Sequence, residues 1–119
     1  MNASRVLFLG RDERAASTIG LQLTTQGIRV QATASLRMAS TQLMRGGIDL
    51  LLVDTGLSVI PARAFLEKAR EFVPQVPRAL LVLEGEEPPC PLDIQRGGAV
   101  VLRLPAQDGW LDTLLSRGP

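Results

Sequence analysis

The sequence predicts a single α/β domain built on a parallel β-sheet. Three short apolar runs, RVLFL (5–9), IDLLLV (48–53) and ALLVL (79–83), have the composition of strands that are buried on both faces. Amphipathic helical segments separate these runs, and a chain that alternates strands with helices forms a parallel sheet with right-handed crossovers. The length of 119 residues fits one domain, 1–119, which is expected to be the whole unit or the N-terminal module of a longer protein.

The first helix is expected over residues 15–26, after Gly10 ends the first strand. Asp12 or Glu13 can cap this helix, and Gly27 is a common helix terminator. Its helically spaced apolar residues are Ala16, Ile19, Leu21 and Leu23. The run IRVQA at 28–32 alternates apolar and polar residues, as a half-covered edge strand does.

The second helix is expected from its capping residue Ser35 to about Arg45, where Gly46 and Gly47 end it. Its inward-facing residues are expected to be Leu36, Ala39, Leu43 and Met44. The buried run at 48–53 follows and places Asp54 at its carboxyl end. Residues 55–60 are predicted to form a loop.

The third helix is expected to have Pro61 in its first turn and to end before Pro74 and Pro77. It carries Phe65, Leu66, Ala69 and Phe72. A fourth helix within 84–96 can be only short, because prolines at 88, 89 and 91 restrict it to about 91–96. A strand at 100–104 and a last helix at 108–116, with Trp110 as its core anchor, complete the pattern.

The composition excludes several classes of function. The 13 cationic and 12 acidic residues nearly cancel, so no charge excess favours nucleic acid or a membrane surface. Histidine is absent, which removes the usual general base and metal ligand, and the single cysteine cannot form an internal disulfide. We therefore expect a cytoplasmic protein that is not an enzyme and needs no cofactor and no metal. Cationic residues are almost all arginine, which fits a GC-rich bacterial genome.

The order and spacing of these segments resemble the receiver domain of bacterial response regulators along nearly the whole chain. The resemblance implies a flavodoxin-like (βα)5 three-layer sandwich, with a five-stranded parallel sheet of order 2-1-3-4-5 and a shortened or irregular fourth helix. The landmarks that carry it are RVLFL, Gly27, the run from Ile48 to Asp54, the small-residue turn Gly97-Gly98-Ala99, and Leu104-Pro105 where receivers carry Lys-Pro.

The resemblance makes Asp54 the position of the phospho-accepting aspartate. In the family, two acidic residues after the first strand hold Mg²⁺, and a hydroxyl residue and a lysine after the fourth and fifth strands contact the phosphoryl group. Most of these positions are replaced here: the acidic pair by Gly10 and Arg11, the hydroxyl residue by Val82 or Leu83, the lysine by Leu104, and the aromatic switch residue by Val101. A phosphoryl transfer needs Mg²⁺ and the lysine to neutralise its negative charge, so the site is expected to be degenerate.

Two features near Asp54 leave alternatives open. Asp12 and Glu13 follow the replaced pair and reach a metal only if the loop shifts its register; otherwise they cap a helix. Arg11 is expected to form an ion pair with Asp54, because both lie at the carboxyl edge of neighbouring strands.

These expectations favour a pseudo-receiver that works in bacterial signal transduction by contact with another signalling protein or an output domain, or by forming a homodimer. The family signals through its fourth helix, fifth strand and last helix, which here span about 88–115 and include Val101, Arg103 and Trp110. No membrane contact and no direct nucleic-acid binding are expected. The alternatives are a working two-component receiver phosphorylated at Asp54, and a sensor that binds a small ligand at the carboxyl edge of the sheet.

Overall fold

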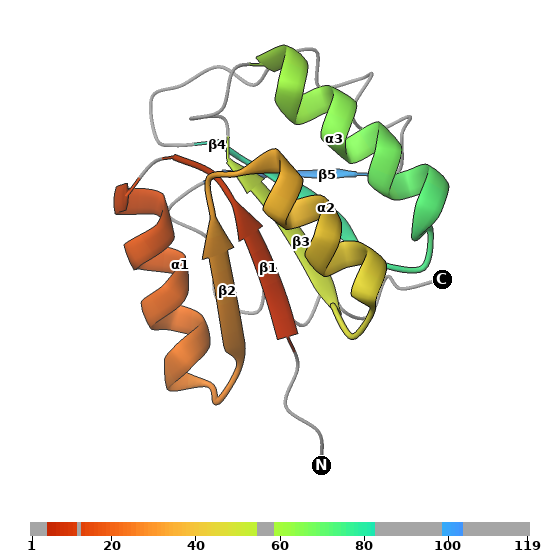
Figure 1. Ribbon diagram of the computed structural model, residues 1–119. Coiled ribbons are helices and arrows are strands. Elements are labelled where there is room, and N and C mark those ends of the chain that lie inside the picture. Colours follow the sequence, from red (N-terminus) through yellow and green to blue (C-terminus); the bar gives the residue numbers. More distant parts are fainter. Residues whose placement is uncertain (1–4, 12, 55–58, 83–98, 104–119) are drawn as a thin grey trace.

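The computed structural model describes residues 5–11, 13–54, 59–82 and 99–103. The strands in these ranges are β1 (Arg5–Leu9), β2 (Arg29–Thr33), β3 (Leu50–Asp54), β4 (Arg78–Val82) and β5 (Val100–Arg103). The helices are α1 (Glu13–Thr25), α2 (Leu36–Arg45) and α3 (Val59–Phe72). Neighbouring strands all pair in parallel, in the order β2-β1-β3-β4-β5, which confirms the predicted fold class (Figure 1). The predicted fourth and last helices lie outside the described residues.

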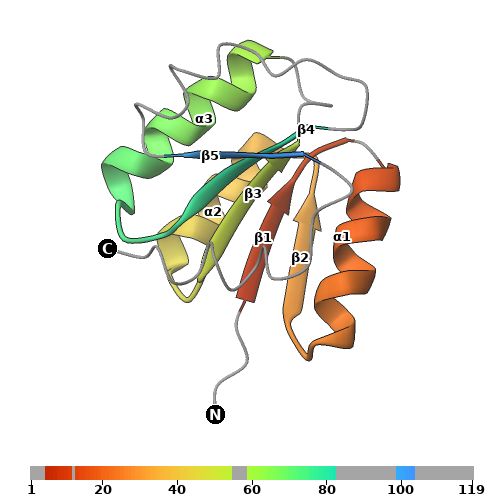
Figure 2. The ribbon, with the colours of Figure 1, turned by 180° about the vertical axis from the view of Figure 1, so that it is seen from behind.

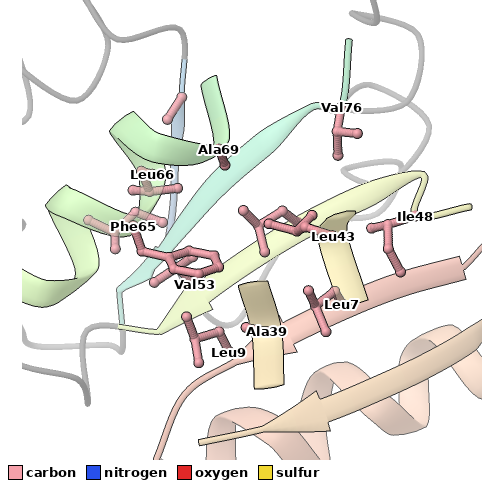
Figure 3. Packing of buried hydrophobic residues seen from close by; sticks show 13 residues of the cluster. Leu7, Leu9, Ala39, Leu43, Ile48, Val53, Phe65, Leu66, Ala69 and Val76 are labelled. Carbon is pink, nitrogen blue, oxygen red and sulfur yellow. The ribbon is translucent and has the colours of Figure 1, made fainter. Parts of the chain in front are cut away.

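The core consists of two apolar layers, one on each face of the sheet. Successive residues of a strand point to opposite faces, so β1, β3 and β4 contribute to both layers. One layer lies beneath α2 and α3 (Figure 3) and includes Leu7, Val53 and Phe65. The other lies beneath α1, on the face seen in Figure 2, and includes Phe8 and Ile19. The central strands are therefore buried on both sides, as their apolar composition predicts.

Both ends of α2 and the carboxyl end of α1 follow the predicted capping chemistry. Ser35 caps α2, and its Oγ accepts a hydrogen bond from the Met38 backbone N–H at 3.2 Å. Gly27, after α1, has a φ of 77°, and Gly46, after α2, has a φ of 84°, so both adopt a conformation that residues with a Cβ rarely take. Pro61 is the third residue of α3 and lies in its first turn, where no helical N–H bond is lost.

Four apolar side chains are more exposed than the sequence predicts. Leu21 lies two residues from both Ile19 and Leu23, so the helical rotation turns it to the side of α1 away from the sheet. Met44 directly follows Leu43, which lies on the inward face of α2, so the helical rotation turns Met44 toward solvent. The exposed residues, with their exposed fractions, are Leu21 (69%), Leu36 (39%), Met44 (66%) and Phe72 (54%).

The observed element boundaries differ from the predicted ones by up to two residues. Helix α1 begins at Glu13 rather than at 15, and α3 begins at Val59, inside the predicted loop 55–60. Strand β3 begins at Leu50 rather than at 48, and the residue before it, Asp49, makes two bonds to Arg5 at the start of β1. The Arg5 N–H donates to Oδ2 of Asp49 and the Asp49 N–H donates to the Arg5 carbonyl, both at 2.8 Å.

A buried arginine begins β4, one residue before the predicted start. The Arg78 guanidinium turns back toward the preceding turn and donates to the carbonyl of Val76 at 3.0 Å. Burial lowers the pKa of Arg78, and the positive charge of Arg70 lowers it further. Within the described ranges, no helix is long and apolar enough to cross a membrane.

Candidate functional site

The candidate site lies at the carboxyl edge of the sheet, where Asp54 is the last residue of β3. The paired positions Leu9 and Val53 place Gly10 beside Asp54 on one side, and Leu81 of β4 is its partner on the other. Asp54 has no solvent-exposed surface. The sequence therefore places this carboxylate correctly at the strand end, and the structure adds that it is fully enclosed.

Gly10 packs directly against Asp54. A Cβ built on Gly10 would lie 2.4 Å from the Cβ of Asp54, 2.9 Å from its Oδ2 and 2.9 Å from Cε1 of Phe8. Separations below 3.0 Å do not occur in real contacts, so no side chain fits at position 10 beside this aspartate. The resemblance gives position 10 to the first metal-binding acid, and here the Asp54 side chain itself occupies the space that such an acid needs.

Arg11 does not pair with Asp54. It lies in a bend just after β1 with its side chain exposed, and these two described residues form no ion pair. The predicted Asp54–Arg11 ion pair is therefore wrong. The physical reason is the cost of desolvation, because the guanidinium would have to leave water to reach the buried carboxylate of Asp54.

The end of β4 brings an aliphatic side chain to the carboxyl edge of the sheet. Val82 is the last residue of β4 and is completely buried, and it pairs with Arg103 at the end of β5. A valine side chain has no group that hydrogen-bonds to a phosphoryl oxygen. Leu83 and Leu104, the neighbouring positions in the sequence prediction, lie outside the described residues.

The predicted interaction face is described only along β5. Val101 is half-buried and packs against the apolar layer beneath α3, whereas Arg103 is exposed. Trp110 lies outside the described residues, as does most of the span 88–115. The assignment of this face stays a prediction.

No group of three or more potential metal-ligating side chains, counting Cys, Asp and Glu, occurs within the described part of the chain. Asp12 lies outside it, and Glu13 is the first residue of α1. Sequence reasoning missed that Gly10 packs against Asp54, because a glycine after a strand is usually explained by the turn alone. Its neighbour Asp54 across the sheet was visible only once the strand register was known.

No protein-family model and no curated protein matches this sequence. Solved structures do match, and they show that the chain has the fold of response regulator receiver domains. A response regulator from Chloroflexus aurantiacus superposes with a TM-score of 0.82 at 21% identity, over 98% of this chain and 100% of that one.

Two further solved structures agree on the fold. The chemotaxis protein CheY4 of Vibrio cholerae matches with a TM-score of 0.77 at 19% identity, over 99% of this chain and 100% of that chain. NtrX of Brucella abortus, solved in complex with ADP, matches with a TM-score of 0.77 at 16% identity, over 98% of this chain and 26% of that one. The same fold thus makes up all of one neighbour and about a quarter of another.

Proposed function

We propose that this chain is a pseudo-receiver, a bacterial signalling module that acts by contact with another protein and takes no phosphoryl group at Asp54. The observation that carries the proposal is the packing of Gly10 against Asp54. Where a phosphorylated receiver needs space for an acid and a divalent cation, any Cβ at position 10 of this chain would lie 2.4 Å from the Cβ of Asp54.

The chemistry of the neighbouring positions supports the same conclusion. A carboxylate that attacks a phosphoryl donor develops negative charge, which a bound Mg²⁺ and a lysine neutralise in a working site. Gly10 offers no ligand, Arg11 is turned to solvent, and Val82 offers no hydroxyl group. By sequence, Leu104 stands where the lysine is expected.

The fold supports a place in two-component signalling, with an output domain or a second signalling protein as the partner. CheY4 consists of this fold alone, whereas NtrX is a chain about four times as long, so the fold occurs both alone and joined to further protein. We assign the contact to the face spanned by 88–115, which includes Val101, Arg103 and Trp110, and this face can also join two copies of the chain.

The test is phosphorylation by a small donor. Purified protein is incubated with acetyl phosphate and Mg²⁺, and its intact mass is measured at short intervals, because acyl phosphates hydrolyse. We expect no mass gain of one phosphoryl group in the wild-type protein. Asp54→Asn is the matched control, and it should likewise gain no phosphoryl mass. CheY-type receiver protein treated in parallel shows that the donor is active.

A mass gain that appears in the wild-type protein and disappears in Asp54→Asn contradicts the proposal. It would instead establish the chain as a working receiver that is phosphorylated at Asp54. A gain that persists in Asp54→Asn would reflect a different acceptor and would leave Asp54 unmodified, as proposed.

A further inference from the structure

Helices α2 and α3 cover the same face of the sheet (Figure 1). Residues of both helices line a groove between them. It consists of two adjoining open hollows of about 340 and 20 Å³, which share Ser40, Phe65 and Lys68. We call it the α2–α3 groove and define it by Arg37, Ser40, Met44, Phe65, Lys68 and Phe72. All of these residues lie in the described part of the chain.

Exposed apolar side chains gather along this groove. Met44 on α2 and Phe72 on α3 line its smaller hollow, and more than half of each side chain is exposed. Leu36 lines the larger hollow and is also exposed. Of the five large apolar side chains that are exposed in the described ranges, three therefore border one groove. Such clustering is typical of a surface that binds another protein.

The charged residues that line the groove are all positive. Arg37 and Lys68 are exposed on its two sides, and among the described residues no acid lines either hollow. Helix α2 itself carries two arginines and no acid. A symmetric contact with a second copy would bring these cations together with their own copies, and like charges disfavour that arrangement. An acidic partner is the complementary one.

We propose that the α2–α3 groove binds an amphipathic helix of a partner protein, with an apolar stripe against Met44 and Phe72 and acidic residues beside Arg37 and Lys68. A helix fits because two packed helices present a groove between them, into which the apolar face of a third helix lies. This surface is distinct from the span 88–115, and its use does not depend on whether Asp54 accepts a phosphoryl group.

The experiment uses two designed peptides of about 16 residues with the same helical leucine stripe. One carries glutamate on the positions that flank the stripe, and the other carries lysine there. Each is titrated into the full-length ¹⁵N-labelled protein, and amide shifts are followed by NMR. We expect the glutamate peptide to shift residues of α2 and α3, including Ser40 and Lys68, and the lysine peptide to bind at least about fivefold more weakly.

Two variants test the groove residues, each with a matched control. Phe72→Ala removes an exposed apolar contact, and its control, Leu21→Ala, removes an even more exposed apolar side chain on α1. Lys68→Glu reverses a charge in the groove, and Arg70→Glu reverses an exposed charge on the same helix that lines neither hollow. We expect both groove variants to weaken binding of the glutamate peptide at least about fivefold, and both controls to bind like the wild type. Circular dichroism checks that all four variants are folded.

Several outcomes would overturn the proposal. One is that the glutamate peptide produces no shifts at millimolar concentration, and another is that both peptides bind equally. Binding to phosphatidylserine–phosphatidylcholine vesicles that is lost in Lys68→Glu, without peptide binding, would assign the surface to a membrane instead. A dimer that Phe72→Ala dissociates in sedimentation experiments would assign it to a second copy.

Discussion

At the scale of single residues, the account depends on the contact between Gly10 and Asp54. Glycine at this position is required by space, since a Cβ would lie 2.4 Å from the Cβ of Asp54. Gly20, in the middle of α1, has no such requirement, because a Cβ added there would meet nothing within 4 Å. The two glycines therefore have opposite physical roles, and replacing each by alanine separates them.

We predict that Gly10→Ala lowers the free energy of unfolding by about 1–3 kcal/mol, because the added methyl group must displace Asp54 or Phe8. Gly20→Ala, the control, is expected to raise it by about 0.5–1 kcal/mol, because glycine is unfavourable in a helix. Urea unfolding followed by circular dichroism measures both changes. If Gly10→Ala is as stable as the wild type, the close packing at Asp54 is wrong.

At the scale of elements, the sheet is aligned at its amino edge by Asp49. This exposed residue precedes β3 and bonds the first residue of β1 through both its backbone and its carboxylate. The two bonds help to fix the register between β1 and β3, in which Leu9 lies beside Val53. The same register brings Gly10 beside Asp54 at the opposite edge, so the alignment of these strands bears on the site.

We predict that Asp49→Ala lowers the free energy of unfolding by about 0.5–1.5 kcal/mol, because the Arg5 N–H loses its carboxylate acceptor. Hydrogen exchange at the Arg5 amide should become faster. Asp49→Asn keeps an oxygen acceptor and is expected to lose less of both stability and protection. Equal losses in the two variants would show that the side-chain bond contributes nothing.

Much of this element structure can be predicted from the sequence. Apolar runs such as RVLFL identify strands that are buried on both faces, and Ser35 and Gly27 mark helix ends by capping chemistry that acts locally. Tertiary contacts decide the rest. Arg78 is buried although arginine is usually exposed, because its guanidinium folds back onto the Val76 carbonyl.

The candidate site was predictable in its composition and not in its geometry. The position of Asp54 at a strand end follows from the apolar run before it. The enclosure of Asp54 by Gly10, and the outward position of Arg11, depend on how two strands distant in sequence pack side by side. A charge-pairing argument from sequence favours the Arg11 ion pair because it counts attraction and omits the cost of desolvation.

At the scale of the whole molecule, the chain combines the fold of receiver domains with a fully buried Asp54 at the carboxyl edge of the sheet and a separate groove on the helical face. The central strands are buried on both faces of the sheet, and the exposed apolar side chains that line the groove lie on α2 and α3. On our proposal, signalling by this molecule depends on which surfaces are recognised, and not on a change of charge at Asp54.

The most direct test of this claim is an NMR titration of the ¹⁵N-labelled protein with Mg²⁺ and beryllofluoride, which mimics a bound phosphoryl group. The account predicts no change in the amide spectrum around Gly10, Asp54 and Val82 with either reagent, and likewise no change when either reagent is added to Asp54→Asn. Saturable shifts of these amides in the wild-type protein that are absent in Asp54→Asn would contradict it, since they would require an open site at the carboxylate.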